Sequence, residues 1–413
     1  MTDEPRPTPD DESGEGAQPL SGLRVLDIST IIAGPLAATL LAEFGAYVLK
    51  VELPGRGDAL RALPPHKDGV ALWWKAVNRN KQGMTLDLRK PAGKDIFMRL
   101  VAQFDVLVEN FRPGTLERWG LAPEVLHEHN PGLTILRVSG FGQRGPYAPR
   151  PGFARIGDAA SGFLSLCGEP DGPPMHCGYP LADTVTGLFG ALGVLVALLH
   201  QRGQGGARGQ VIDASLLESM FRMLDFLPIE YDQLGVVRGR SGNRNPYAAP
   251  GNVYRTRDGR WVSVAATTQS IFERLATAMA RPDLVSDPRY ATNVDRLENV
   301  EALDREIARW IGERDQASVC ELLERHAVAA APVSTIDELF RDPHVAAMGM
   351  LVNVPDADFG TVRMQGVVPR LSRTPGRLTA TGPALGEHTE EILRERLGLD
   401  AESIAALAAD GVI

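Results

Sequence analysis

The chain has 413 residues, of which 44% are hydrophobic, and its 43 basic residues are interspersed with 52 acidic ones to give a formal net charge of -9. This length exceeds the size at which a single hydrophobic core keeps growing, so we expect two domains, or one large domain with a substantial insertion. The mixed, mildly acidic charge argues against a nucleic-acid-binding surface.

The chain begins with a segment, residues 1–19, that is acidic and rich in Pro and Gly, which predicts a disordered tail rather than a signal or transit peptide. The longest apolar run, residues 188–199, is shorter than the roughly twenty residues that cross a bilayer, so it predicts a buried helix and no membrane contact. The three cysteines form no CxxC pair, so we expect no disulfide framework and no zinc or other metal site. A cytoplasmic protein with reduced thiols is the simplest interpretation.

The first half of the chain alternates short apolar strands with helices. Such alternation predicts an α/β fold with a doubly wound, mainly parallel sheet that carries helices on both faces. The expected elements are strand 23–28, helix 34–45, strand 46–52, strand 84–88, helix 91–104, strand 106–110, a helix from Thr115 and strand 134–140.

The second half continues with a helix after Asp183, a strand over 210–215 and a helix from Leu216. A Gly-, Arg- and Asn-rich stretch follows, which indicates a linker or a substrate loop. Beyond it the sequence predicts a hairpin that turns at Asp258-Gly259, and then helices. We therefore expect a large domain over 20–220, a linker over 221–245, a small α+β domain over 246–330, and a C-terminal return over 331–413 that packs on the large domain.

Familiar catalytic motifs are missing from the sequence. The stretch "GFGQRG" at 140–145 matches GxGxxG, but the prolines that follow it prevent the helix that a dinucleotide site requires, so we expect a loop. The sequence has no GxSxG, HExxH or GxxxxGK[ST] motif. Serine hydrolases, zinc peptidases and P-loop enzymes are therefore disfavoured.

Three cations lie at or near the ends of predicted strands, on the side of a doubly wound sheet where ligands bind. Lys81, Arg112 and Arg118 either capture phosphate groups or are solvated surface charges. Asn110 and Phe111 end a predicted strand and would line the same crevice.

Asp183 lies directly before the least polar run of the chain. A carboxylate in this position is either the N-cap of the following helix or a working group, and the two roles are compatible. A carboxylate near a helix N-terminus is expected to stay ionised, which suits a nucleophile.

Ten stretches between residues 20 and 395 together resemble the family III CoA-transferases, a group that includes formyl-CoA and carnitine CoA-transferases and has 2-methylacyl-CoA racemases as relatives. Among them are "LSGLRVLDISTIIAGP", "NRNKQGMTLDL", "VLVENFRPGTLERWG", "LADTVTGLFGALGVLVAL" and "GQVIDASLLES". The resemblance implies a Rossmann-like large domain built from both chain ends, an inserted small domain, and a homodimer of two interlinked ring-shaped chains.

The resemblance also implies the roles of particular residues. Asp183, in the "D-x-x-x-G" landmark, would be a nucleophile that forms a mixed anhydride and then an aspartyl-CoA thioester. No permanently bound cofactor is implied, because coenzyme A enters as the acyl-CoA substrate. The positions where family members contact CoA are Ile32, Ala33, Lys81, Asn110, Phe111, Arg112 and Arg118.

Some positions depart from the family pattern. Phe153, Ala154 and Asp158 stand where transferases often carry Tyr, Asp and Gln. Leu53 replaces an arginine that contacts the nucleotide in some members, with Arg56 or Arg61 as replacements. The glycine run of formyl-CoA transferases is missing, so a preference for formate or oxalate is not supported.

Two other functions remain as alternatives. A racemase needs a second base, and Phe153 occupies its usual histidine position, with His176 or Asp158 as weaker substitutes. A non-catalytic CoA-binding subunit is the other alternative, against which the retained Asp183 argues.

The acceptor acid would be recognised by an arginine if it is a dicarboxylate such as succinate, malate or mesaconate. We expect succinyl-CoA as a donor. The arginines on or near the substrate loops are Arg155, Arg238, Arg240 and Arg244, each of which could equally be a surface residue.

Overall fold

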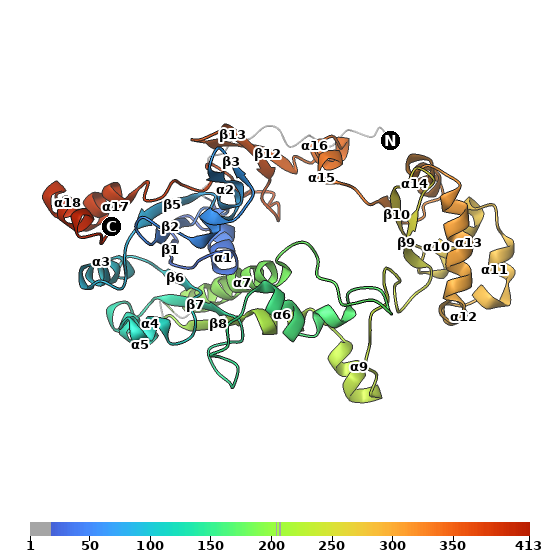
Figure 1. Ribbon diagram of the computed structural model, residues 1–413, viewed down its shortest axis with the longest axis horizontal. Helices are drawn as coiled ribbons and strands as arrows, with labels where there is room; N and C mark the ends of the chain where they lie inside the picture. Colours follow the sequence, from blue (N-terminus) through green and yellow to red (C-terminus); the bar gives the residue numbers. More distant parts are fainter. Residues whose placement is uncertain (1–17, 204, 206–207) are drawn as a thin grey trace, which may run out of the picture. The chain divides into compact units, whose positions relative to one another are not determined.

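A computed structural model describes residues 18–203, 205 and 208–413 of the chain and divides them into two units (Figure 1). Unit 1 runs to Ser161, resumes over Tyr179–Met223 and ends with Gly349–Ile413, so both chain ends belong to it. Unit 2 consists of Gly162–Gly178 and Leu224–Met348. Residues 1–17 of the expected tail lie outside the described residues.

These units differ from the expected domains at three places, one of which is the expected linker, because its residues 224–245 belong to unit 2. Residues 162–178 were expected in the large domain and 331–348 in the C-terminal return, but both segments belong to unit 2. For the second segment the reason is a strand: β11 (Ala330–Pro332) pairs with β10 (Trp261–Ala265) of unit 2. The expected linker, 221–245, contains the helix α9 (Leu227–Leu234).

Unit 1 is built on a six-stranded sheet in which all neighbouring strands are parallel, which confirms the α/β prediction. Counted along the chain, the strands are arranged 3-2-1-4-5-6, so the strand order reverses between β1 and β6. Ligands of such sheets bind at the carboxyl ends of the strands beside this reversal. In spatial order the strands are β5 (Lys81–Thr85), β2 (Tyr47–Glu52), β1 (Arg24–Asp27), β6 (Val106–Glu109), β7 (Thr134–Ser139) and β8 (Val211–Ser215).

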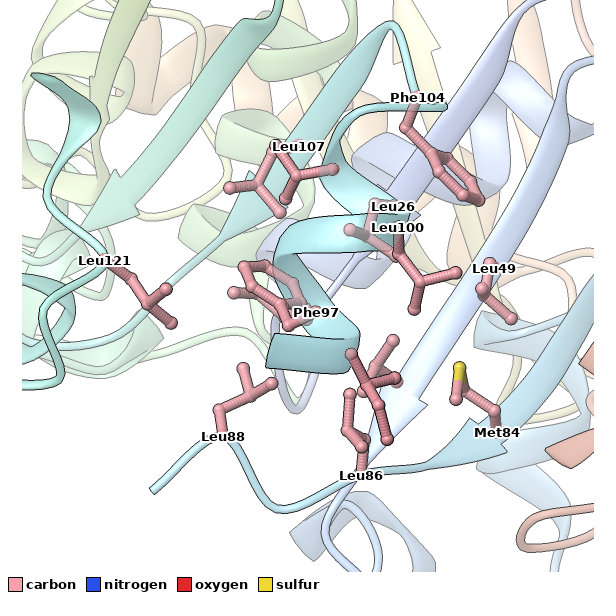
Figure 2. Packing of buried hydrophobic residues seen from close by; sticks show 14 of the residues in the cluster. Leu26, Leu49, Met84, Leu86, Leu88, Phe97, Leu100, Phe104, Leu107 and Leu121 are labelled. Atoms are coloured by element: carbon pink, nitrogen blue, oxygen red, sulfur yellow. The ribbon is translucent and has the colours of Figure 1, made fainter. Parts of the chain in front are cut away.

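Helices cover both faces of this sheet. On one face α1 (Ala33–Ala42) and α7 (Leu181–Gly203) pack on each other and on the central strands. On the other face the strands contribute Leu26, Leu49 and Leu107 to a buried cluster that includes side chains of α3 (Pro91–Val101) (Figure 2). Side chains of α5 (Pro123–His129) and α17 (Thr389–Leu397) belong to the same cluster. The sheet thus forms the middle layer of unit 1.

Helix α7 is longer and more exposed than the apolar run 188–199 suggested. It has 23 residues, which is long and apolar enough to cross a membrane by length and composition alone, and half of its most apolar stretch is buried in the protein. Leu192, Val196 and Leu199 are 55%, 59% and 73% exposed. The expected buried helix is thus buried on one side, where it faces α1 and the sheet, and exposed on the other.

The C-terminal segment of unit 1 packs on the first strands as expected. Thr85 N–H of β5 donates to Thr389 Oγ1 at 3.0 Å, and Trp74 Nε1 donates to Pro383 O at 2.8 Å. This segment contains the hairpin β12 (Leu351–Asp356)–β13 (Gly360–Gln365), and the helices α17 and α18 (Ala401–Ala409).

Unit 2 contains a three-stranded antiparallel sheet, in the order β11-β10-β9, with a core of its own. The hairpin between β9 (Gly251–Arg255) and β10 turns at Asp258-Gly259 as predicted, and Gly259 has the left-handed φ of 78° that such a turn requires. Its longer helices are α10 (Gln269–Ala278), α13 (Val300–Gly312) and α14 (Gln316–Arg325).

Shorter elements complete the two units. In unit 1 they are η1 (Ala59–Ala62), β3 (His66–Lys67), β4 (Val70–Ala71), α2 (Leu72–Val77), α4 (Thr115–Arg118), α6 (Ala154–Ala160) and α8 (Leu216–Arg222). In unit 2 they are η2 (Phe163–Leu166), α11 (Asp283–Ser286), η3 (Pro288–Tyr290), α12 (Asn293–Glu298), α15 (Ile336–Leu339) and α16 (Pro343–Ala347).

Candidate active site

A cavity of about 110 Å³ in unit 1 brings Asp183 together with three of the other predicted site residues, Ile32, Ala33 and Asn110. It lies where β1, β6 and β7 end, at the reversal of strand order. The expected loop at 140–145 is confirmed, and its first residue belongs to the wall. The lining residues are Thr30, Ile31, Ile32, Ala33, Asn110, Val138, Ser139, Gly140, Gly152, Phe153, Asp183 and Leu216.

Asp183 reaches this cavity from the first turn of α7. The helix begins at Leu181, so Asp183 is inside it and is not the N-cap that one interpretation expected. One turn further on, Gly187 lies against α1: a Cβ built on Gly187 would come within 3.0 Å of Ala33 O and 3.1 Å of Leu36 Cβ. The glycine of the D-x-x-x-G landmark thus lets α7 approach the start of α1, and this approach places Asp183 beside the loop before α1.

Burial raises the pKa of Asp183 to about 7, and the negative charge of Asp158 contributes in the same direction. Asp158 is buried on α6, which packs closely against α7 because Gly157 has no side chain: a Cβ there would lie 3.1 Å from Ala182 Cβ. The expectation that Asp183 stays ionised was therefore wrong near neutral pH, where a group with this pKa is only partly ionised, because burial disfavours the charged carboxylate.

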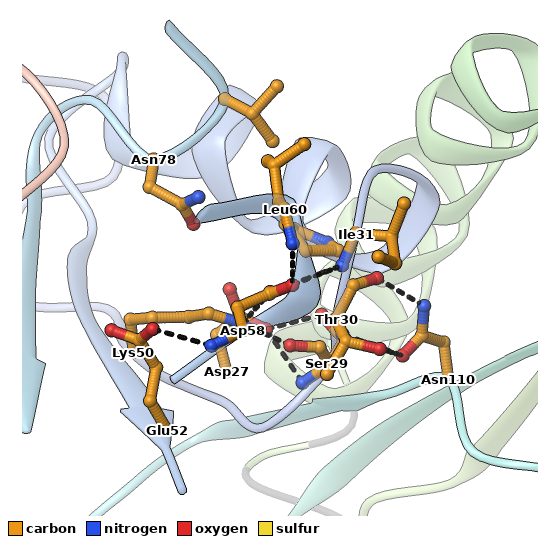
Figure 3. A network of polar contacts seen from close by, with 12 residues as sticks. Asp27, Ser29, Thr30, Ile31, Lys50, Glu52, Asp58, Leu60, Asn78 and Asn110 are labelled. Carbon is orange, nitrogen blue, oxygen red and sulfur yellow. Dashed lines mark hydrogen bonds and ion pairs between the residues drawn. The ribbon is translucent and has the colours of Figure 1, made fainter. Parts of the chain in front are cut away.

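The loop between β1 and α1 is held by side chains from three other segments (Figure 3). Thr30 N–H donates to Asn110 Oδ1 and Asn110 Nδ2 donates to Thr30 O, both at 2.7 Å. Lys50 Nζ donates to Ser29 O, and Ile31 N–H donates to Asp58 Oδ1 at 3.0 Å. The cavity wall at this loop is therefore fixed by polar contacts that are buried or partly buried.

Lys81 does not line the cavity, which corrects its predicted place at the ligand-binding edge. It begins β5, three residues before the predicted start of that strand, and its side chain is fully buried. The Nζ group donates to Asp27 Oδ2 at 2.9 Å, Pro35 O at 2.7 Å and Asn78 Oδ1 at 2.9 Å, which uses all three of its protons. Burial lowers the pKa of Lys81 to about 8. Its place at the amino end of β5 gives it a structural role.

A second, larger cavity of about 280 Å³ lies at the carboxyl ends of β1, β2, β5 and β6 and shares Thr30 with the first. Phe111 lines it and meets the ring of Trp119 edge to face at 5.0 Å. Arg56 and Arg89 supply positive charge to its wall. Sequence reasoning missed Arg89, although its position directly after the predicted strand 84–88 was a signal for the ligand-binding edge.

Comparison with known proteins identifies the family of the chain. Residues 20–389 match the family described as CoA-transferase family III. The chain belongs to this family. It is 45% identical over 397 residues, 96% of this chain and 98% of the relative, to the succinyl-CoA–D-citramalate CoA-transferase of Chloroflexus aurantiacus. It is 47% identical over 399 residues, again 96% and 98%, to the beta subunit of succinyl-CoA–L-malate CoA-transferase of the same organism.

A solved structure shares the fold of this family III CoA-transferase. A CAIB/BAIF family protein from Brucella suis superimposes with a TM-score of 0.82 at 33% sequence identity, over 92% of this chain and 100% of that one. The sequence-based family assignment is thereby confirmed.

The contacts of Arg56 and Arg61 differ, and they distinguish the two candidate replacements for the arginine that Leu53 replaces. Leu53 lines the larger cavity, and so does Arg56, whose side chain is exposed. Arg61 instead pairs with Glu52, with Nε to Oε2 at 2.7 Å, and its guanidinium lies over the ring of Trp74. Arg56 is therefore the replacement that the structure leaves available for a nucleotide.

Phe153 occupies the wall of the Asp183 cavity at the position where racemases carry a histidine, and 68% of it is exposed. No histidine stands among the described residues of that wall. His176 belongs to unit 2. Asp183 is the one His, Asp or Glu among the described residues of this wall, whereas a racemase needs two acid/base groups on opposite sides of the substrate carbon.

The remaining predicted cations lie on the surface of their units. Arg112 and Arg118 are exposed after β6, outside the walls of both cavities, and Arg118 Nη2 donates to Thr115 Oγ1 at 2.9 Å. Of the arginines considered for the acceptor acid, three are engaged within unit 2: Arg238 pairs with Glu230, Arg240 donates to Glu169 O and Pro170 O, and Arg244 pairs with Asp304. Arg155, exposed on α6, is the fourth.

Among the described residues, 18–203, 205 and 208–413, no group of three or more His, Cys, Asp or Glu side chains is arranged to hold a metal ion.

Proposed function

We propose that this enzyme transfers CoA from succinyl-CoA to a dicarboxylic acid that carries a hydroxyl group next to one carboxylate. The observation that supports this proposal is the pair of substrates named for two full-length relatives, which are 45% and 47% identical to this chain. Both are named for succinyl-CoA as one substrate, and their other substrates, D-citramalate and L-malate, are 2-hydroxy dicarboxylic acids.

In this proposal CoA extends across both cavities of unit 1. The nucleotide end lies in the larger cavity, where the apolar faces of Phe111 and Trp119 and the guanidinium groups of Arg56 and Arg89 suit an adenine with its phosphates. The thioester end lies beside Asp183. Thr30 supports this arrangement because it lines both cavities. Ile32, Ala33, Asn110, Phe111, Arg112 and Arg118 stay among the proposed CoA contacts, and Lys81 does not.

The chemistry would be carried by Asp183 as nucleophile. Its ionised carboxylate attacks the thioester carbonyl of succinyl-CoA, the C–S bond breaks, and a mixed anhydride forms while the CoA thiolate leaves. The thiolate then attacks the aspartyl carbonyl, which releases succinate and leaves an aspartyl-CoA thioester. The acceptor carboxylate attacks this thioester in the same way, and the thiolate finally takes the acceptor's acyl group, which restores Asp183. CoA stays bound throughout, so the thiolate acts at high effective concentration.

We also propose that the enzyme is a homodimer, as the family resemblance implies. The exposed side of α7, with Leu192, Val196 and Leu199, is a continuous apolar surface of the kind that marks an interface. In unit 2, Ile229 and Leu234 of α9 are also largely exposed. Light scattering on the purified chain tests this proposal: a mass of twice 44.6 kDa is expected, and a monomer would contradict it.

The function is tested by mass spectrometry of the acyl-CoA products in heavy water. Wild type and Asp183→Asn are incubated with succinyl-CoA and a panel of acids, with malate and citramalate beside mesaconate, glutarate and formate. New acyl-CoA of a hydroxy diacid, made by wild type and not by the variant, and without deuterium at the alpha carbon, is the expected result. Deuterium at that carbon without CoA exchange would indicate a racemase, and no turnover of any acid would favour a non-catalytic CoA-binding subunit.

A further inference from the structure

Ile31 has a backbone conformation that β-branched residues rarely adopt. Its φ is 68°, in the left-handed region, where the branched Cβ crowds the backbone. It lines the Asp183 cavity, directly before Ile32 and Ala33. Strained residues persist only where their surroundings over-determine them, so specific contacts must hold Ile31 in place.

The contact that holds Ile31 is the carboxylate of Asp58. Ile31 N–H lies 3.0 Å from Asp58 Oδ1 and 3.1 Å from Oδ2, and Leu60 N–H donates to Oδ1 at 2.9 Å. The Asp58 side chain is fully buried, and Lys50 Nζ lies 3.3 Å from its Oδ2. Since Lys50 also donates to Ser29 O, this one ion pair holds the loop on both sides of Thr30 (Figure 3).

Asp58 also stands between the two cavities. It lines the larger one, Ile31 lines the smaller one, and Thr30 lines both. The hydrogen bond from Ile31 to Asp58 therefore belongs to the partition that separates the two cavities.

We propose that Asp58 is a positioning residue of this enzyme: it holds Ile31 in the left-handed conformation and thereby fixes the loop that forms one wall of the Asp183 cavity. When its carboxylate is lost, Ile31 returns to a negative φ and the wall moves relative to Asp183. The proposal rests on the transferase function above. The competing explanation is that Asp58 serves only as the N-cap of η1, through Leu60.

The experiment combines Asp58→Asn with changes at position 31. In Asp58→Asn one carboxylate oxygen is replaced by an NH2 group, which cannot accept a hydrogen bond. This NH2 group faces either Lys50 or the N–H groups of Ile31 and Leu60, and the group that it faces loses its acceptor. This variant is made with isoleucine, alanine or glycine at position 31. Alanine and glycine both remove the cavity-lining side chain, but only glycine adopts a positive φ without strain, which makes Ile31→Ala the matched control.

The expected result is a fall in kcat of about tenfold to a hundredfold for Asp58→Asn with isoleucine or alanine at position 31, because a small displacement of a reacting geometry has effects of that size. With glycine at that position the fall in kcat caused by Asp58→Asn should be less than about threefold, because glycine adopts the positive φ without the carboxylate. An equal fall in all three backgrounds, or no fall in any, would overturn the proposal, since a simple cap would not depend on position 31.

A second measurement needs no substrate and covers the case in which Asp58→Asn does not fold. With Asp58 intact, Ile31→Gly should have a higher melting temperature than Ile31→Ala, the reverse of the usual order, because the site requires a positive φ. Equal melting temperatures, or a higher one for Ile31→Ala, would contradict the proposal. A wild-type chain without any transferase activity would refute the proposed function instead, and the stability comparison would still test the positive φ at position 31 on which the role of Asp58 depends.

Discussion

Asn110 and Thr30 join the end of β6 to the loop after β1 through two hydrogen bonds of 2.7 Å each, one in each direction. The side-chain amide of Asn110 satisfies both the N–H and the C=O of Thr30, as a neighbouring strand would. The two strands lie on opposite sides of the reversal in strand order. Asn110 thus continues the sheet where its backbone pairing stops, beside the Asp183 cavity.

Replacing Asn110 should therefore reduce catalysis by moving this loop. Asn110→Ala leaves both polar groups of Thr30 without their partner, and at about 1 kcal/mol for each lost bond we expect kcat/KM to fall about tenfold to a hundredfold. Asn110→Asp keeps the acceptor and loses the donor, so its kcat/KM should fall less than that of Asn110→Ala. Steady-state kinetics with succinyl-CoA measures both variants; an Asn110→Ala enzyme with wild-type kcat/KM would show that the loop is held without this pair.

The raised pKa of Asp183 predicts how activity depends on pH. The nucleophile acts as a carboxylate, and burial together with Asp158 raises its pKa to about 7, so kcat/KM should increase as the pH rises through about 7. Asp158→Asn removes a neighbouring negative charge, which lowers the pKa of Asp183 and should move the profile toward lower pH. The measurement is kcat/KM between pH 5 and 9 for both enzymes. Superimposable profiles would show that Asp158 does not influence Asp183.

The same shift predicts a change in stability that requires no substrate. Because the folded pKa of Asp183 is raised from 3.8 to about 7, its contribution to the free energy of unfolding is fully present below about pH 4 and is lost as the pH rises through about 7. Asp183→Asn avoids this loss, so it should be more stable than wild type at pH 8 by about 1–2 kcal/mol, and equally stable at pH 4. Thermal unfolding at both pH values tests the sign; a destabilised variant at pH 8 would contradict it.

The sheet could be predicted from sequence because its strands are apolar and follow one another along the chain. The apolar pattern predicts the start of β5 three residues too late, because the strand begins with the polar residues Lys81 and Gln82. The buried charge of Lys81 is balanced by the carboxylate of Asp27, 54 residues earlier in the chain. No local sequence pattern indicates such a distant ion pair, and a lysine near a predicted strand end therefore suggests phosphate binding instead.

Asp183 could be identified because a helix, a glycine four residues later and a family landmark coincide at one place. The contact between Asp58 and Ile31 could not be predicted, because no sequence pattern indicates a positive φ at a β-branched residue. Arg89 could have been found from its position directly after a predicted strand, at the ligand-binding edge, but its pairing with Asp87 is visible only in the structure.

Lys81 and Arg89 should therefore respond in opposite ways to substitution. Lys81→Met leaves Asp27 without one of its two cationic partners inside the protein, and we expect a loss of about 3–5 kcal/mol in the free energy of unfolding. Arg89→Ala removes an exposed guanidinium from the larger cavity, so stability should stay within about 0.5 kcal/mol of wild type. Its KM for succinyl-CoA should rise about tenfold, the effect of one lost charge-assisted contact.

Denaturant titration and steady-state kinetics on both variants check this pair of predictions. A stable Lys81→Met enzyme with a raised KM would restore Lys81 as a CoA contact and would mean that its buried network opens when the substrate binds. An unchanged KM in Arg89→Ala would remove Arg89 from the proposed CoA site.

Gly187 connects the packing of α7 to the chemistry of Asp183. A methyl group at this position would meet Ala33 O at 3.0 Å, and backbone cannot move aside as a side chain can. Gly187→Ala should cost about 1–3 kcal/mol of stability through overpacking. It should also lower kcat about tenfold or more, because α7 can relieve the contact only by carrying Asp183 away from the loop before α1.

Gly203→Ala, at the far end of α7, is the matched control, since a Cβ there meets no atom within 4 Å. It should keep wild-type kcat and stability. Chemical denaturation and kcat for the two variants separate packing from catalysis. If Gly187→Ala lost stability but kept kcat, the position of Asp183 would not depend on how closely α7 approaches α1. The glycine of the landmark would then serve only the fold.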